Sequence, residues 1–326
     1  MMTNLLVTGG AGFIGSSFVG QQVAKGNRVV VLDKLTYAGK KENLTWIGED
    51  KYKLIIGDIL DEPLLKKIID EHDIDKIIHF AAESHVDNSI KNPDAFIQTN
   101  INGTHSLLKI ALSQYKKKPN FHFHHISTDE VFGDLPLEGN EKFTEETPYN
   151  PSSPYSASKA ASDHLVRAYY TTYNLPITIS NCSNNYGPRQ HDEKLIPTII
   201  KKAIAGDEIG IYGDGKNVRD WIHVDDHNRA VDLILEKGKI GATYCIGGNN
   251  ELDNNQVVNK ICEILDKIKP KSNGKSYEEQ ITYIKDRAGH DRRYAIDGSK
   301  IENELGFKNQ ITFEGGVEKL IIENAK

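Results

Sequence analysis

Five side chains in the central part of the sequence have types and spacings that could carry out chemistry on a hydroxyl group. Tyr155 and Lys159 are four residues apart, which places them on one face of a helix. An ammonium beside a phenol stabilises the phenolate and lowers its pKa, so Tyr155 could act as a base toward a sugar or alcohol hydroxyl. Thr128 could hydrogen-bond the reacting oxygen from the other side. Asp129 and Glu130 follow directly, and two acids beside a Tyr-x-x-x-Lys pair indicate chemistry beyond hydride transfer.

A glycine-rich segment near the start, VTGGAGFIG, is typical of a cofactor-binding turn. Gly9, Gly12 and Gly15 follow the first apolar run, so a tight turn can present the N-terminal amides of a helix to a pyrophosphate. Asp33 ends the second apolar run, where a carboxylate can accept hydrogen bonds from ribose hydroxyls and repel a 2′-phosphate. The pattern favours NAD over NADP, although the neighbouring Lys34 could reach a phosphate and weakens that preference.

The order of apolar and helix-like segments predicts the framework that positions these residues. Apolar runs alternate with helix-like segments, which is typical of a parallel sheet with crossover helices. The runs are Leu5 to Thr8, Val29 to Leu32, Leu54 to Ile56, Lys76 to Phe80, Phe121 to Ile126 and Ile177 to Ser180. The expected helices begin at about Phe13 and span 93–117 and 153–174. We therefore predict an α/β fold with a Rossmann-type, doubly wound parallel sheet.

The cofactor would extend across such a sheet. Asp58 and Ile59 follow the third run, and Ala81 and Ala82 follow the fourth, so these residues would meet its adenine and middle portions. Small alanines at these positions could equally serve packing alone.

The alternation of apolar runs and helix-like segments becomes irregular after Asn181. The segment CSNNYGPRQHDEKLIP is loop-like, then 224–236 is predicted as a helix, 243–246 as a strand and 255–268 as a helix. We expect a smaller, interleaved C-terminal α/β domain that binds the substrate. The predicted cofactor domain comprises residues 1–181 with about 217–247, and the substrate domain comprises 182–216 and 248–326.

Composition narrows the class of partner. The chain has 326 residues, 26% of them charged, and a net charge of −6, which gives no reason to expect nucleic-acid binding. No stretch approaches the roughly 18 apolar residues of a membrane span, and the first residues have no basic segment followed by an apolar one. We expect no membrane partner and a cytoplasmic location.

Neither the cysteines nor the histidines predict a metal site. Cys182, Cys245 and Cys262 are odd in number and far apart, which argues against a disulfide framework or a zinc site. His122 and His124 alternate on one strand face and could ligate a metal, but no matching Cys or acidic spacing completes the set. We expect no metal.

Nearly the whole chain resembles the extended short-chain dehydrogenase/reductase superfamily and, within it, the dTDP-glucose 4,6-dehydratases. The resemblance is carried by the blocks TGGAGFIG, AAESHVDNSI, STDEVFG, YSASK, NCSNNYGPRQ, EKLIP, GDGKNVRDWIHVDDH and DRAGHDRRYAID. Related sugar epimerases typically lack a carboxylate at the position of Glu130, whereas this sequence has both acids, as the dehydratases do.

The resemblance implies a role for each acid. Tyr155 would remove the 4-hydroxyl proton of the sugar while hydride passes to NAD, Glu130 would take the carbon 5 proton, and Asp129 would protonate the departing 6-hydroxyl. Hydride would then return to carbon 6, so NAD would stay tightly bound and be regenerated in each cycle. Repulsion between neighbouring carboxylates could keep one acid protonated, although the sequence does not decide which one.

The resemblance also implies the contacts of the two ligands and a homodimer. The further cofactor contacts are expected to be Phe13, Ile14, Leu35, Thr36, Ser84, Thr99 and Asn185, with the catalytic Tyr155 and Lys159. The nucleotide-sugar contacts are expected to be Ser84, Thr128, Asp129, Glu130, Asn184, Lys194, Leu195, Ile211, Tyr212, Arg219, Asn254, Arg287 and His290. The sequence departs from the family pattern at Asn88, Ala288 and Asp192, where arginine, proline and proline are usual.

Two alternatives stay open at this point. The chain could be another nucleotide-sugar dehydratase, an epimerase or a decarboxylase of the same fold. It could also be a catalytically silent NAD-binding regulator, although the intact set from Thr128 to Lys159 argues against that.

Overall fold

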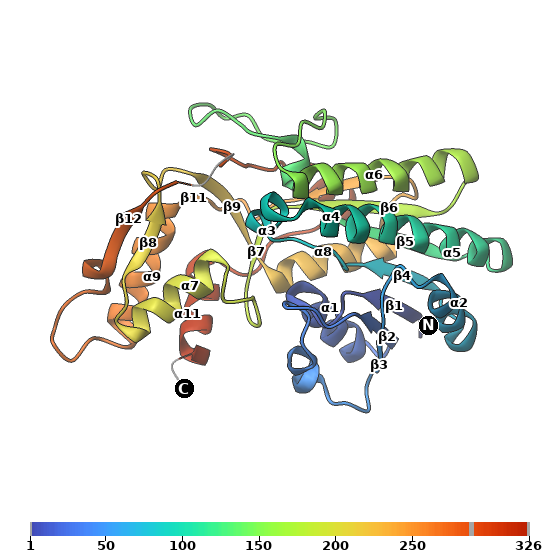
Figure 1. The fold of residues 1–326 in the computed structure, drawn as a ribbon, viewed down its shortest axis with the longest axis horizontal. Coiled ribbons are helices and arrows are strands. Elements are labelled where there is room, and N and C mark those ends of the chain that lie inside the picture. The colour runs from blue at the N-terminus through green and yellow to red at the C-terminus, as the bar shows by residue number, and fades with distance from the viewer. Residues whose placement is uncertain (1, 287–289, 325–326) are drawn as a thin grey trace.

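A computed structural model describes residues 2–286 and 290–324, and a seven-stranded sheet is its largest element (Figure 1). All neighbouring strands of the sheet are parallel, in the order β10-β6-β5-β4-β1-β2-β3. The strands are β1 (Asn4–Thr8), β2 (Arg28–Asp33), β3 (Lys53–Ile56), β4 (Lys76–His79), β5 (His122–Thr128), β6 (Ile177–Cys182) and β10 (Thr243–Ile246). The predicted Rossmann-type fold is confirmed.

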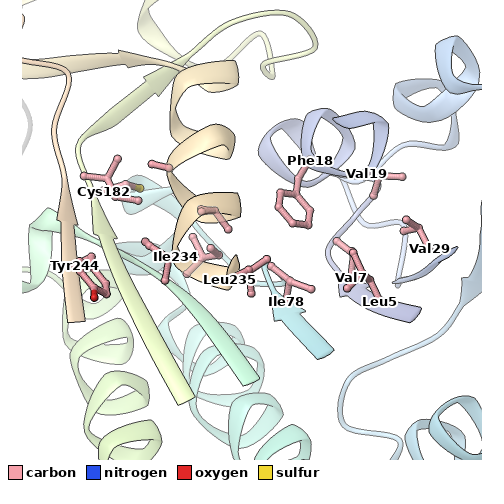
Figure 2. Close-up of a cluster of buried hydrophobic side chains, with 14 of the residues drawn as sticks. Leu5, Val7, Phe18, Val19, Val29, Ile78, Cys182, Ile234, Leu235 and Tyr244 are labelled. Atoms are coloured by element: carbon pink, nitrogen blue, oxygen red, sulfur yellow. The ribbon is translucent and has the colours of Figure 1, made fainter. Parts of the chain in front are cut away.

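Helices cover both faces of the sheet because alternate side chains of its buried strands point to opposite sides. Leu5 and Val7 of β1 belong to one apolar core, and Leu6 between them belongs to the other. The first core is closed by α1 (Phe13–Ala24), α8 (Val224–Lys237) and α10 (Ser299–Leu305). Figure 2 shows Phe18 of α1 beside Val7, and Ile234 of α8 over the sheet. The second core is closed by α2 (Glu62–His72), α5 (Thr104–Lys117) and α6 (Pro154–Tyr173).

The six predicted strands are all present in the sheet, with small shifts at their ends. The β4 strand ends at His79, one residue before the predicted Phe80, and β5 continues to Thr128, two residues beyond the predicted Ile126. The predicted strand 243–246 is β10, which pairs with β6 at the edge of the same sheet. The extension of β5 carries the chain directly to Asp129.

The segment 93–117 is not one regular helix as predicted. It consists of α4 (Pro93–Phe96), a π-helical stretch Ile97–Gly103 and α5. Wide π turns occur often at functional sites. Here the turn holds Asn100, whose amide donates to Ser158 Oγ at 2.8 Å and accepts from the Glu83 backbone N at 2.9 Å. The widened turn thereby ties the loop after β4 to α6.

A second, smaller lobe is built from the later part of the chain and lies at the left in Figure 1. Its three-stranded sheet has the order β11-β9-β7, and β8 pairs in parallel with β12. The strands are β7 (Asn184–Tyr186), β8 (Ile209–Tyr212), β9 (Val218–His223), β11 (Glu251–Asp253) and β12 (Ile281–Ile284). Three helices supply its apolar core: α7 (Leu195–Ala205), α9 (Asn254–Ile268) and α11 (Phe313–Asn324). The sequence predicted only α9 of these elements, within one residue of its start.

The remaining helical segments are short. They are η1 (Lys41–Ile47), α3 (Val86–Lys91), η3 (Asp129–Phe132) and η4 (Tyr277–Gln280). Within the described ranges, no helix combines the length and apolar character needed to span a membrane.

Candidate active site

A cavity of about 340 Å³ opens at the carboxyl ends of the parallel strands. It is lined by the segments that follow β1, β2, β3 and β4 and by the ends of β5 and β6. After β1 the chain enters α1 on one face of the sheet, whereas after β4 it leads to α5 on the other face. Such a switch point is where open α/β sheets bind ligands.

The glycine turn fits a pyrophosphate because it leaves no space for side chains. Gly9 has φ of +70°, and a Cβ added to it would lie 2.5 Å from the backbone N of Ala81. A Cβ on Gly15 would collide with the carbonyl oxygen of Gly9. The helix α1 begins at Phe13, as predicted, and no side chain caps its N-terminus, so its first amides can serve an anion in the cavity.

Asp33 holds the loops around the cofactor site in addition to facing the cavity. Its Oδ2 accepts a hydrogen bond from the Ala11 backbone N, and its Oδ1 accepts one from the Leu35 backbone N, both at 2.9 Å. Burial raises the pKa of Asp33, and the two hydrogen bonds oppose that rise. Lys34, which could have served a phosphate, forms an ion pair with Asp58 at 2.7 Å. At this edge of the cavity, Asp33 therefore holds the two loops in place, and Asp58 holds the Lys34 side chain.

Local structure explains the position of the Tyr155 and Lys159 pair. The helix α6 starts with a capping box in which Ser153 Oγ accepts from the Ser156 backbone N, and Pro154 occupies its first turn. Tyr155 therefore lies in the first turn of α6, where it lines the cavity together with Lys159. The Lys159 ammonium donates a hydrogen bond to the carbonyl oxygen of Ile126 at 2.8 Å, which fixes the helix to β5.

Thr128, Asp129 and Glu130 are brought to the same cavity by the end of β5. Thr128 caps the short η3 helix: its Oγ1 accepts from the Glu130 backbone N and donates to Asp129 Oδ1, both at 3.3 Å. The Oδ2 atom of Asp129 is buried and has no hydrogen-bond partner within the described residues. Burial, and then the charges of Glu130 and Asp220, raise the pKa of Asp129 well above its ordinary value. The five predicted catalytic side chains thus line the same cavity.

The pKa of Tyr155 shifts in the opposite direction to the one predicted from sequence. Burial, followed by the charge of Glu130, raises it well above 10, and the hydrogen bond with Thr128 opposes the rise. Burial lowers the pKa of Lys159, against the effect of the charge of Asp163. The spacing of Tyr155 and Lys159 could not reveal how strongly both groups are desolvated.

Most of the predicted cofactor residues surround the cavity. Its lining contains Gly9, Gly12, Phe13, Ile14, Gly15, Asp33, Lys34, Thr36, Asp58, Ile59, Ala81, Ala82, Ser84, Thr99, Tyr155, Lys159 and Asn185. Leu35 is missing from the lining and packs instead against the first apolar core. NAD requires a particular set of hydrogen-bond donors and acceptors. The glycine turn after β1, the Asp33 carboxylate and the hydroxyl groups of the lining provide this set.

The predicted substrate residues fall into two groups. Ser84, Thr128, Asp129, Glu130, Asn184 and Lys194 line the cavity, whereas Leu195, Ile211, Tyr212, Arg219, Asn254 and His290 belong to the second lobe outside that lining. In the second group, the rings of Tyr212 and His290 are 6.3 Å apart, and the Arg219 guanidinium stacks over Tyr294 at 4.2 Å. The positive charge of Arg219 opposes the rise in the pKa of Asp129, so this second group lies close enough to interact with the catalytic residues. Arg287 lies outside the described residues.

Two of the three departures from the family pattern can be placed. Asn88 lies in α3 and hydrogen-bonds the Tyr37 hydroxyl at the edge of the cavity. Asp192 forms an exposed ion pair with Lys201 at 2.7 Å. Ala288 lies outside the described residues.

Sequence reasoning missed a set of side chains that joins the two lobes at the mouth of the cavity. Glu193 lies between two histidines, with its Oε1 3.5 Å from His85 Nδ1 and its Oε2 3.6 Å from His191 Nδ1. The ring of His191 meets that of Tyr37 edge-on at 5.6 Å. These residues come from three distant segments, and no spacing in the sequence connects them.

The histidines of β5 bond to neighbouring hydroxyl groups. His122 Nε2 lies 2.9 Å and His124 Nδ1 2.8 Å from Thr178 Oγ1 on β6, and His124 Nε2 lies 3.1 Å from Ser180 Oγ. Across residues 2–286 and 290–324, no group of three or more His, Cys, Asp or Glu side chains could hold a metal ion. The three cysteines are buried and free.

Comparisons with known proteins agree with this geometry. A family model described as GDP-mannose 4,6 dehydratase matches residues 6–320. The dTDP-glucose 4,6-dehydratase of Xanthomonas campestris pv. campestris (strain B100) is 53% identical over 322 residues, which cover 97% of this chain and 91% of the relative. The crystal structure of the dTDP-glucose 4,6-dehydratase DesIV of Streptomyces venezuelae, with NAD and dTDP bound, is 42% identical with a TM-score of 0.89, covering 98% of this chain and 96% of that one.

The shared fold is wider than one reaction. The UDP-glucose 4-epimerase of Thermotoga maritima reaches a TM-score of 0.88 at 28% identity, covering 99% of both chains. Backbone similarity alone therefore does not separate epimerases from dehydratases. The higher identity over almost the full length does, together with the presence of both Asp129 and Glu130. This chain belongs to the dTDP-glucose 4,6-dehydratase family.

Proposed function

We propose that this chain converts dTDP-glucose into dTDP-4-keto-6-deoxyglucose and water in a redox-neutral, NAD-dependent reaction. The observation that carries the proposal is the pair of adjacent acids beside Tyr155, one buried and one partly buried. Elimination of water needs a base and an acid at the same time, and two acids in different environments can supply both. The bound NAD supplies hydride transfer from carbon 4 and later to carbon 6.

Tyr155, Glu130 and Asp129 then divide the proton transfers of the reaction between them. Tyr155 takes the proton of the 4-hydroxyl as a phenolate, which the Lys159 ammonium and the positive nicotinamide ring of bound NAD would favour against the burial that raises its pKa. Thr128 hydrogen-bonds the same oxygen. The ketone makes the carbon 5 proton acidic, Glu130 removes it, and Asp129 donates a proton to the 6-hydroxyl as it leaves as water. Glu130 returns a proton to carbon 5 at the end. After one turnover Tyr155 has gained a proton and Asp129 has lost one, so these two groups must be reset before the next cycle.

The two lobes would divide the ligands between them. We assign NAD to residues 1–181 with 224–247, because α8 and β10 complete the core and the sheet of that lobe. The boundary expected near 217 moves, because β9 (Val218–His223) pairs with β7 and β11 of the second lobe. We assign the nucleotide diphosphate to residues 182–223 and 248–326. Lys194, Arg219 and His290 offer the cations and donors that a diphosphate requires, and Ile211, Tyr212, Leu195 and Asn254 frame the base side.

We also propose a homodimer that works in the cytoplasm. Family resemblance supports the dimer, and exposed apolar side chains at Ile97 before α5 and Tyr173 at the end of α6 are available for a helical interface. Three buried free thiols and a nicotinamide cofactor suit a reducing compartment. Light scattering of the NAD-loaded protein tests the dimer, and a monomer at micromolar concentration would contradict it.

A product assay tests the reaction. The protein is incubated separately with dTDP-glucose and with the UDP, CDP and GDP sugars, and the product is weighed by mass spectrometry. We expect loss of one water, fastest with the dTDP sugar. A sugar of unchanged mass with an altered NMR spectrum would identify an epimerase, and unchanged substrate in all four incubations would favour a silent NAD-binding protein.

A further inference from the structure

The helix α6 carries a buried carboxylate one turn beyond Lys159. Tyr155, Lys159 and Asp163 follow one another at intervals of four residues, so they lie along one face of the helix. Asp163 has an exposed fraction of 0%, and Lys159 is buried as well. A buried charge is unfavourable unless an opposite charge or hydrogen bonds compensate it. The buried charges of Lys159 and Asp163 must therefore be compensated by groups inside the protein.

A histidine ring connects the two buried charges. His125 Nε2 lies 3.4 Å from Lys159 Nζ on one side and 3.2 Å from Asp163 Oδ1 on the other. Burial lowers the pKa of His125 to about 4, so its ring is neutral near pH 7. An ammonium can only donate, so Nε2 accepts from Lys159 when the ring proton is on Nδ1. Asp163 Oδ1 itself makes no hydrogen bond within the described residues, so Asp163 acts on Lys159 through its charge, with the neutral ring beside both groups.

Three hydrogen bonds hold the Asp163 carboxylate in one orientation. Its Oδ2 accepts from Ser127 Oγ and from the Tyr149 hydroxyl, both at 2.8 Å, and from Asn181 Nδ2 at 3.3 Å. These donors come from β5, from the loop before α6 and from β6. Burial raises the pKa of Asp163, but the His125 contact and the charge of Lys159 hold it below its ordinary value. The carboxylate is therefore an ionised and rigidly placed anion.

The other titratable groups around Lys159 cannot replace this anion. His79 on β4 and His125 on β5 are neutral or, if protonated, positive. Cys182 on β6 has a pKa raised to about 12 by burial, and burial also raises the pKa of Tyr155 on α6. The charge of Asp163 is thus the anionic contribution that opposes desolvation of Lys159 near neutral pH.

We propose that Asp163 is a positioning residue of the reaction, whose negative charge, acting past the neutral His125 ring, keeps the Lys159 ammonium protonated on the face of α6 that carries Tyr155. The inference rests on the proposed function in one respect, namely that Tyr155 and Lys159 act in turnover. Without the anion, Lys159 would lose its proton at a lower pH, and the charge that favours the Tyr155 phenolate would be lost with it.

A charge-removing substitution with a matched control tests the role in turnover. Asp163→Asn keeps the shape and an acceptor oxygen but removes the charge. Tyr149→Phe removes one hydrogen bond to the same carboxylate and leaves the charge. We expect the alkaline limb of the pH profile of kcat/KM to move to lower pH by about one unit in Asp163→Asn, a tenfold loss at higher pH. The limb should stay in place in Tyr149→Phe. An unmoved limb in Asp163→Asn overturns the proposal.

A second measurement does not need turnover and does not depend on the folding of Asp163→Asn. Side-chain ¹⁵N NMR of the unsubstituted, NAD-loaded protein reports the charge of each lysine, and the Lys159 signal is the one that Lys159→Arg removes. We expect Lys159 to be an ammonium at pH 7. A neutral Lys159 amine at pH 7 overturns the proposal. Failure to dehydrate dTDP-glucose would instead overturn the proposed function, and the NMR result would still decide whether Lys159 is the ammonium that the role of Asp163 requires.

Discussion

Asp129 is 2% exposed, whereas Glu130, the next residue in the chain, is only partly buried. Both acids lie on η3 and line the cavity, and the first is buried more deeply than the second. Burial is the largest cause of the raised pKa of Asp129, and the charge of Glu130 adds to it. Burial and the charge of Glu130 therefore both favour the protonated form of Asp129, which is the form that the proposed acid requires.

Replacing the proposed base should stop the elimination without affecting the cofactor. In Glu130→Gln the amide cannot take the carbon 5 proton, so we expect kcat to fall by roughly 10²- to 10⁴-fold. The amount of NAD that copurifies should stay at the level of the unsubstituted protein. The measurement is product formation by mass spectrometry together with NAD content. Normal turnover of Glu130→Gln would show that the base is elsewhere.

Solvent deuterium should distinguish the two acids. In heavy water the product should carry deuterium at carbon 5, because the partly buried Glu130 can exchange its proton with solvent. With Asp129→Asn, removal of the carbon 5 proton can continue while loss of water is slowed, so recovered dTDP-glucose should also become labelled. With Glu130→Gln it should stay unlabelled. NMR of recovered substrate and product measures this, and a product without label in the unsubstituted protein contradicts the mechanism.

The glycine turn can be tested against a glycine of similar backbone conformation. Gly9 and Gly26 have φ of +70° and +82°, so alanine strains either position by about 1–2 kcal/mol. An added Cβ at Gly26 meets no atom within 4 Å, whereas at Gly9 it lies 2.5 Å from the Ala81 backbone N. We expect Gly26→Ala to lower only the free energy of unfolding and Gly9→Ala to lose bound NAD as well. Denaturant titration and NAD content give the comparison, which Gly9→Ala with a full NAD complement would refute.

Buried histidines should make the protein less stable in mild acid. Burial lowers the pKa of His125 and His227 from 6.5 to about 4, and that of His124 well below 6.5. Below pH 6.5 the unfolded chain binds protons that the folded chain does not, so the free energy of unfolding falls as the pH drops from about 6.5 to about 4. Urea unfolding at several pH values measures the slope.

A pair of substitutions identifies the histidines responsible for that slope. His227→Gln removes a buried ring and should reduce the dependence on pH. His105→Gln changes an exposed ring and should leave the dependence as it is. Equal slopes in all three proteins would mean that the buried histidines do not cause the loss of stability.

The sequence predicted the sheet and the catalytic group because both depend on local patterns. Apolar runs of three to six residues predicted the buried strands, and the end of β5 places Thr128 and Asp129 at the cavity. The short strands of the second lobe, such as β7 with 3 residues, carry no such pattern. The sequence could not predict electrostatic properties either, since the pKa of Tyr155 on α6 depends on burial and on Cys182 of β6. The same applies to Asp163, whose partners lie on three segments.

The position of β10 at the sheet edge bears on how the chain is made. Every residue of β6 is buried, and β10, which covers its outer edge, is drawn from residues 243–246. On the ribosome, β6 leaves the exit tunnel long before β10 does, so its hydrogen-bonding groups remain open to other chains in the interval. The nascent protein would therefore be prone to associate with other chains after β6 has emerged and before β10 has. Slow translation of the residues between the two strands would lengthen this interval and raise the demand for chaperones.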